Sequence, residues 1–123
     1  MEIIGIGTDL IEINRIQNCL TRFGNRFIEK IFTHNETKII ADKNFCISHI
    51  AKRWAAKEAC IKALNKQITW QEIEIHNLSS GQPIIKLLPA HFDKHIAHLS
   101  LTDEKHYAVA MQLIVKLTHQ IGI

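Results

Sequence analysis

One alanine-rich stretch near the middle of the chain constrains the fold more than any other feature. Residues 53–63 read RWAAKEACIKA and contain no glycine, no proline and almost no β-branched residue. This composition predicts a helix. Alanines at positions 51, 55, 56, 59 and 63 indicate that much of its circumference packs closely against other elements. We therefore expect a central helix around which the rest of the chain is organised.

Charged side chains fall on regular positions of this helix. Neighbours on a helix surface lie three and four residues apart, so Trp54, Glu58 and Lys62 share one stripe, and Arg53 and Lys57 form a second pair. On an ordinary surface helix these would be solvated charges, with a Glu–Lys contact worth about 0.3–0.5 kcal/mol. On a helix that is mostly packed, a charged stripe beside an aromatic ring more often lines a site.

Length, charge and cysteine content narrow the function classes. We expect one domain, residues 1–123, which is small for an enzyme with a deep cleft of its own, so a site shared between subunits is considered. The net charge of +3 suits an acidic partner but falls short of a nucleic-acid footprint. Three unpaired-looking cysteines and the lack of a span of about 20 apolar residues predict a cytoplasmic protein that binds neither nucleic acid nor membrane.

The first third of the sequence predicts one strand and several helices. Residues 2–8 are apolar and β-branched, which indicates a buried strand that ends at Asp9. A helical apolar period follows as far as Phe23, and Gly24 separates it from a short second helix. Thr33 and Glu36 have the spacing of a capping box, so a third helix is expected to begin there.

The second half of the sequence predicts an antiparallel sheet. The central helix is expected to begin near Ser48 and to end at Asn65, which tolerates a left-handed cap. Alternating patterns then predict hairpins over residues 72–87 and 98–115, with a short helix over residues 89–96 between them. The fold class is therefore α+β: an antiparallel sheet, joined by the first strand, packs against a long central helix and shorter N-terminal helices.

Asp9 and Glu58 form the first candidate for chemistry. Two carboxylates can hold Mg²⁺ and leave its other positions to water and substrate phosphate. Arg53, Lys57 and Lys62 would then supply positive charge to a polyphosphate, because the chain has no Walker motif. The alternative for Asp9 alone is a helix N-cap.

Three histidines form a weaker candidate. His91, His95 and His98 have the spacing H-x3-H-x2-H, which could present two imidazoles on one helix face for zinc. The glutamate of an H-E-x-x-H motif is missing, and the chain has eight histidines in all. Coincidence is therefore the better account of this spacing.

Several ordered blocks of the chain resemble the holo-(acyl carrier protein) synthases, the small bacterial family of 4′-phosphopantetheinyl transferases. The blocks are residues 4–16 (IGIGTDLIEINRI), 53–63, 70–75, 81–83 and 98–104. The resemblance covers almost the whole chain and implies the fold of that family. It also implies transfer of the 4′-phosphopantetheine group from coenzyme A to a serine of apo acyl carrier protein, which yields 3′,5′-ADP and supports fatty acid biosynthesis.

The resemblance also implies roles for particular residues. Mg²⁺ would be the cofactor, held by Asp9 and Glu58, with Lys62 offsetting phosphoryl charge and either Glu58 or a metal-bound water acting as the base. The implied coenzyme A contacts are Arg53, Lys57, His98, Ser100 and Thr102. The implied docking face for the acidic carrier protein consists of Arg15, Arg22 and Arg26.

The resemblance also implies an assembly, namely a homotrimer with active sites between subunits. Two alternatives stay open at this point: a non-catalytic module that binds carrier protein, and another Mg²⁺-dependent enzyme that cleaves a pyrophosphate.

Overall fold

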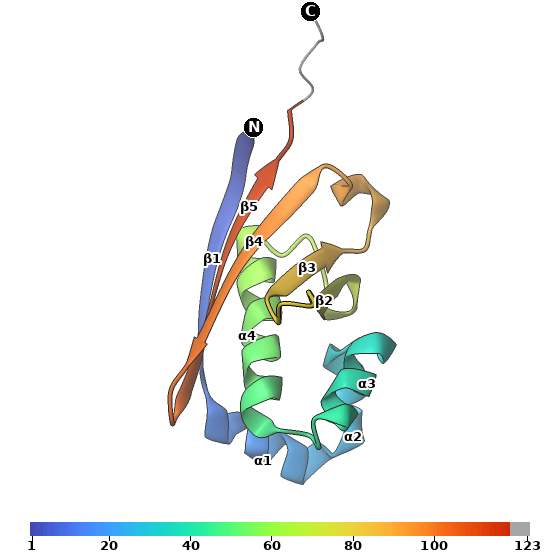
Figure 1. Cartoon of the computed structure of the whole chain (residues 1–123), viewed down its shortest axis with the longest axis vertical. Coiled ribbons are helices and arrows are strands. Elements are labelled where there is room, and N and C mark those ends of the chain that lie inside the picture. Colours follow the sequence, from blue (N-terminus) through green and yellow to red (C-terminus); the bar gives the residue numbers. More distant parts are fainter. Residues whose placement is uncertain (119–123) are drawn as a thin grey trace, which may run out of the picture.

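The computed structural model describes residues 1–118, so residues 119–123 of the expected domain lie outside the described part. The first half of the chain forms one strand and then a series of helices (Figure 1). They are β1 (Glu2–Glu12), α1 (Ile13–Phe23), α2 (Asn25–Ile31), α3 (His34–Asp42) and α4 (Ile47–Ala63). The second half contains the remaining strands and two single-turn 3₁₀ helices, namely η1 (Trp70–Glu72), β2 (Ile73–Asn77), β3 (Pro83–Leu87), η2 (Ala90–Phe92), β4 (His95–Asp103) and β5 (Tyr107–Lys116).

The strands form two antiparallel sheets. β5 lies between β1 and β4 in a three-stranded sheet, and β2 pairs with β3 in a two-stranded sheet. Helix α4 lies along one face of the larger sheet, and the β2–β3 hairpin and α3 lie on the other side of α4 (Figure 1). The α+β fold class and both hairpins are thus confirmed.

Two glycines of β1 explain why the central helix is rich in alanine. A Cβ atom added at Gly7 would lie 1.9 Å from the carbonyl oxygen of Ala59, and one added at Gly5 would lie 2.0 Å from that of Ala63. Only glycine on the strand and alanine on the helix permit this approach of two backbones. The contact between β1 and α4 is therefore close enough to bring side chains of both elements to a common seam.

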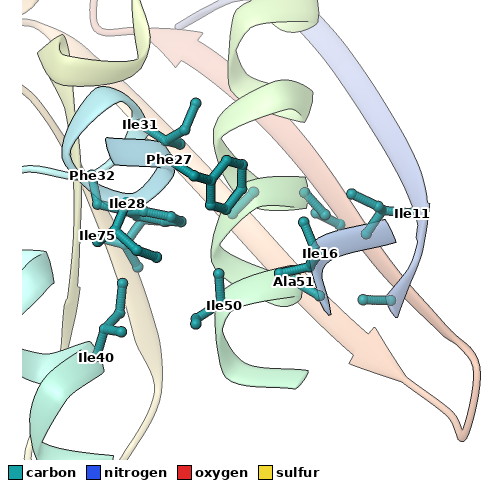
Figure 2. Close-up of a cluster of buried hydrophobic side chains, with 14 of the residues drawn as sticks. Ile11, Ile16, Phe27, Ile28, Ile31, Phe32, Ile40, Ile50, Ala51 and Ile75 are labelled. Atoms are coloured by element: carbon teal, nitrogen blue, oxygen red, sulfur yellow. The ribbon is translucent and has the colours of Figure 1, made fainter. Parts of the chain in front are cut away.

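The main core lies between α4 and the smaller helices. Phe27 and Ile31 of α2 point toward α4, Ile28 lies beside Ile75 of β2, and Ile50 of α4 belongs to the same cluster (Figure 2). All of these side chains are buried. This cluster fixes the N-terminal helices and the β2–β3 hairpin against the side of α4 that faces away from the larger sheet.

Local signals account for several element boundaries. Thr33 and Glu36 form the predicted capping box, Gly24 separates α1 from α2 with φ of 59°, and Asn65 follows α4 with φ of 53°. No helix within residues 1–118 is long and apolar enough to cross a membrane.

Two predicted boundaries are wrong. β1 does not end at Asp9 but continues to Glu12, because Asp9 pairs with Ala110 of β5 and the strand remains paired as far as Glu12. Asp9 is therefore not an N-cap. The predicted helix over residues 89–96 is only the turn η2, because pairing with β5 makes residue 95 the start of a strand.

Candidate active site

The seam between β1 and α4 brings Asp9 and Lys62 into contact, and Glu58 lies on the same helix. The ammonium group of Lys62 lies 3.1 Å from Oδ1 of Asp9 and donates a hydrogen bond of 2.9 Å to the carbonyl oxygen of Thr8. Glu58 lies one turn before Lys62 on α4, next to the residue that packs on Gly7. The Asp9 side chain is 15% exposed and that of Lys62 is 55% exposed, so the seam opens to solvent on the lysine side.

Each carboxylate of the seam is held through one oxygen only. Oδ1 of Asp9 contacts Lys62, and Oε1 of Glu58 accepts a hydrogen bond of 3.1 Å from the indole Nε1 of Trp70. Within residues 1–118, Oδ2 of Asp9 and Oε2 of Glu58 accept no hydrogen bond from the protein. Two carboxylates with free oxygens fit Mg²⁺, which is commonly held by one or two carboxylates together with substrate phosphates.

Lys57 does not lie at the surface, which corrects its prediction as a coenzyme A contact. The residue is fully buried, and its ammonium group donates to the carbonyl oxygens of Ile31, Trp70 and Ile73 at 3.0, 2.8 and 2.8 Å. It also forms an ion pair with Glu36. Burial lowers the pKa of the Lys57 ammonium, and the Glu36 carboxylate counteracts part of that effect. No donor of Lys57 is left for a phosphate.

Arg53 lines a cavity of about 360 Å³ between α4, the β2–β3 turn and β4, together with His49 and Lys52. Its Nη2 donates a hydrogen bond of 2.8 Å to Oδ1 of Asn77 in β2. Its Nη1 is buried and has no partner within the described part of the chain. A buried guanidinium nitrogen without an acceptor is suited to an anionic ligand that enters the cavity.

Lys52 and Arg53 give the α4 side of this cavity positive charge, and Lys52 is paired with Asp103 at 3.5 Å. Burial, followed by the charges of Arg53, Lys43 and Lys52, lowers the pKa of His49 to about 4. His49 is thus neutral at pH 7 beside three cations. Ser100 of β4, a predicted coenzyme A contact, also lines this cavity, as does Asp103.

His98 and Thr102 lie on a different face from Arg53. Along β4, residues 97, 99 and 101 are half-buried toward the core, whereas His98, Ser100 and Thr102 are exposed. These three side chains lie on the face of the sheet opposite α4; because β4 is an edge strand, Ser100 still borders the cavity of Arg53. His98 lines a separate cavity of about 410 Å³ between β3 and β4. One chain therefore does not bring all the predicted coenzyme A contacts together, and His95 and His98 do not share a helix face.

The three predicted docking arginines are all exposed on α1 and α2. Arg15 and Arg22 belong to α1, and the guanidinium of Arg22 lies 5.2 Å from the ring centroid of Phe23. Arg26 of α2 borders an apolar hollow of about 340 Å³. The hollow is lined by Cys19, Phe23, Arg26, Phe27, Lys30, Ile31, Trp54 and Trp70.

Trp70 is the site residue that sequence reasoning did not single out. It follows the central helix in the loop and turn before β2, where no helical or strand period connects it to Glu58. Its signals in the sequence were a large aromatic residue in a mostly polar segment and its place at the start of the block 70–75. Its contact with Glu58 is a product of tertiary structure.

Comparison with known proteins identifies the class. A family model described as the 4′-phosphopantetheinyl transferase superfamily matches residues 5–112, so the chain belongs to that superfamily. Two relatives are the holo-[acyl-carrier-protein] synthases of Pseudoalteromonas atlantica, 41% identical over 125 residues, and of Bartonella tribocorum, 43% identical over 130 residues. These matches cover 93% and 94% of this chain, and 98% and 97% of the respective relatives. Within the superfamily, the chain is a member of the holo-(acyl carrier protein) synthases and hence an enzyme.

Solved structures agree with this placement. The holo-(acyl-carrier-protein) synthase from Bacillus anthracis, crystallised in complex with CoA (3′,5′-ADP), is 35% identical with a TM-score of 0.78. The holo-[acyl-carrier-protein] synthase from Neisseria meningitidis is 30% identical with a TM-score of 0.84. Each match covers 93% of this chain, and 97% and 99% of the respective structures. The predicted family and its fold are thereby confirmed.

Proposed function

We propose that the β1–α4 seam carries out the transfer of 4′-phosphopantetheine from coenzyme A to a serine of apo acyl carrier protein, with 3′,5′-ADP as the second product, in support of fatty acid biosynthesis. The observation that carries this proposal is the contact of Lys62 with Asp9 across the seam, with the Glu58 carboxylate one helical turn before Lys62 on α4. Asp9 and Glu58 would hold Mg²⁺, which would neutralise charge on the pyrophosphate of coenzyme A.

The charge on the phosphoryl oxygens and the proton of the carrier serine must also be accommodated. Lys62 is mostly exposed and offsets charge on the phosphoryl oxygens once it exchanges its contact with Asp9 for one with substrate. Either Glu58 or a water on the open side of the seam accepts the proton of the carrier serine. Phosphoryl transfer depends mainly on positioning and charge stabilisation, so no protein nucleophile is required.

Arg53 and Ser100 bind the phosphate-rich end of coenzyme A in the cavity that they share. The support is the buried, partnerless Nη1 of Arg53 and the surrounding positive charge. His98 and Thr102 extend this binding surface from the outer face of the sheet.

The outer face of the larger sheet is the proposed contact between subunits. Ile6, Leu10 and Met111 are 65%, 61% and 47% exposed on strands whose other face packs on α4. No helix covers that face within residues 1–118 (Figure 1). A homotrimer would bury these side chains and bring His98 of one copy toward the seam of another, which accounts for a site that is incomplete in a single chain.

The acidic carrier protein is proposed to dock on α1 and α2. Arg15, Arg22 and Arg26 supply exposed positive charge, and Arg26 borders the apolar hollow that Trp70 also lines. Because Trp70 contacts Glu58, a carrier seated on this hollow would hold its serine near the metal pair.

Intact mass spectrometry of an apo acyl carrier protein tests the proposed function. The carrier is incubated with the enzyme and coenzyme A, with Mg²⁺ or with a chelator, while 3′,5′-ADP is followed by chromatography. We expect a phosphopantetheine-sized mass gain that requires Mg²⁺ and disappears with Glu58→Gln but not with Glu29→Gln, an exposed glutamate of α2. Normal turnover by Glu58→Gln would disprove the role of the pair. Carrier binding without any product would favour the binding module, and cleavage of another nucleotide would favour a different pyrophosphate enzyme.

A further inference from the structure

The two carboxylates of the seam differ in the kind of donor that holds them. Asp9 is held by the ammonium group of Lys62, which carries a charge and is exposed. Glu58 is held by the indole N–H of Trp70, which is neutral and can only donate. A neutral donor orients a carboxylate without neutralising it, so the full negative charge of Glu58 stays available to a cation.

The backbone that carries Trp70 is held from several directions. Its carbonyl oxygen accepts a hydrogen bond of 2.8 Å from the buried ammonium of Lys57. The next residue, Gln71, donates from Nε2 to the carbonyl oxygens of Glu29 and Phe32, both at 2.8 Å. Side chains at positions 69 and 72 close a capping box around the same turn. Such a turn has little freedom to rotate relative to α4.

The indole ring is also fixed by packing. Its centroid lies 5.6 Å from that of Trp54, which in turn stacks on Phe27 at 5.4 Å with an interplanar angle of 18°. Trp54 lies on α4 one turn before Glu58, so the helix supplies both the carboxylate and the ring that supports its donor. The direction of the Nε1–H bond is therefore determined by the fold and not by the carboxylate.

We infer that Trp70 is a positioning residue that holds Oε1 of Glu58 and leaves Oε2 as the oxygen presented to a divalent cation. This inference rests on the proposed function, because it assumes that Asp9 and Glu58 hold the ion. Partners that orient metal ligands commonly change metal affinity 10- to 100-fold when they are removed. The ring of Trp70 also lines the apolar hollow, so its role in packing must be separated from its role as a donor.

Trp70→Phe separates these roles, because it keeps an aromatic ring and removes the donor. The control is Trp54→Phe, which alters the neighbouring ring and leaves the hydrogen bond to Glu58 in place. Binding of Mn²⁺, used as a probe for Mg²⁺, is measured without turnover from the electron paramagnetic resonance signal of the free ion. We expect Trp70→Phe to weaken Mn²⁺ binding about tenfold or more and Trp54→Phe to change it less than about threefold. Equal affinities of Trp70→Phe and the wild type would overturn the inference.

A measurement on the unsubstituted indole covers the case in which Trp70→Phe does not fold. In the ¹⁵N-labelled wild type, the two indole N–H signals are assigned with Trp54→Phe, and Mg²⁺ is then added. We expect the Trp70 indole signal to move during the titration and to differ in Glu58→Gln, whereas an unmoved signal would contradict the positioning role. If the wild type binds no Mn²⁺ at all and Glu58→Gln behaves identically, the proposed metal pair fails first, and the inference with it.

Discussion

The ammonium group of Lys57 and the carboxylate of Glu36 form an ion pair in the interior of the molecule. Lys57 is fully buried and Glu36 is 4% exposed. Oε1 of Glu36 also accepts from the backbone N–H of Thr33, and its Oε2 accepts from that of Ile75 at 2.9 Å. The pair thus joins α4 to α3 and β2, and Lys57 additionally holds the backbone of Trp70.

The first prediction concerns the stability that this pair contributes. Lys57→Met leaves the Glu36 carboxylate buried without its charged partner, and breaking a buried pair in this way typically lowers the free energy of unfolding by about 3–5 kcal/mol. Urea unfolding measures the loss. Lys52→Met is the matched control, because the half-exposed Lys52 lies 3.5 Å from Asp103 and surface pairs contribute about 1 kcal/mol or less. Unchanged stability of Lys57→Met together with a raised KM for coenzyme A would restore the phosphate contact predicted from sequence.

Lys57 also shows which features of the site can be predicted from the sequence and which cannot. Helical spacing predicted that Glu58 and Lys62 share one stripe of the central helix, and Lys62 contacts Asp9 of β1. The same spacing could not distinguish a lysine at the surface from one in the core, because depth depends on elements that pack on α4 from distant parts of the chain. The buried ammonium group of Lys57 donates hydrogen bonds to carbonyl oxygens of residues that are 13 to 26 positions away in the sequence.

For the strands too, pairing between neighbouring segments could be predicted from the sequence, whereas pairing between distant segments could not. Alternating patterns predicted both hairpins, because each hairpin is made of neighbouring segments. The end of β1 was misjudged, because the strand is extended by pairing with β5, almost a hundred residues away. The roles of Gly5 and Gly7 were likewise invisible until α4 was placed against them.

The second prediction tests that close approach. Gly7→Ala would place a methyl group 1.9 Å from the Ala59 carbonyl oxygen, and backbone atoms cannot yield as a flexible side chain can. We expect the free energy of unfolding to fall by about 3 kcal/mol or more, at the upper end of overpacking effects. Thr8→Ala is the control, since Thr8 is an exposed neighbour on the same strand. Wild-type stability of Gly7→Ala in urea would show that β1 and α4 can separate without loss.

The third prediction concerns the cavity beside α4. Arg53→Ala removes the guanidinium whose Nη1 is buried without a partner, so we expect weaker binding of coenzyme A and 3′,5′-ADP. Hydrogen bonds to charged groups are worth about 1.5–3 kcal/mol, which corresponds to a loss of about tenfold to a hundredfold. Titration calorimetry with both ligands measures it. Lys86→Ala, an exposed cation of β3, should bind both ligands like the wild type; equal losses in the two variants would indicate a general charge effect.

The fourth prediction addresses the assembly. Leu10→Glu places a charge on the exposed apolar face of the larger sheet, so light scattering should report dissociation of the proposed trimer and activity should be lost with it. Leu78→Glu, at an exposed leucine outside the sheets, should leave both unchanged. A trimer that persists in Leu10→Glu would place the subunit contact elsewhere.

A mixing experiment examines whether the site is shared between copies. Glu58→Gln and His98→Ala each disable one part of the proposed site, and a mixed trimer contains some sites with neither change if the two residues come from different subunits. Recovered activity after mixing would support a shared site. No recovery from mixed trimers would mean that both residues act within one chain.

The fifth prediction concerns recognition of the carrier protein. Arg15→Glu reverses a charge on the exposed face of α1, so the KM for an acidic carrier protein should rise by about tenfold while the affinity for coenzyme A stays within about twofold of the wild type. Lys38→Glu, an equal charge change on the exposed side of α3, is the matched control. The wild-type KM for the carrier should also increase with ionic strength, because salt screens the attraction between the two proteins. The KM of Arg15→Glu should increase less, because the substitution has already removed part of that attraction. Similar damage to coenzyme A binding and carrier binding would instead assign Arg15 a structural role in α1.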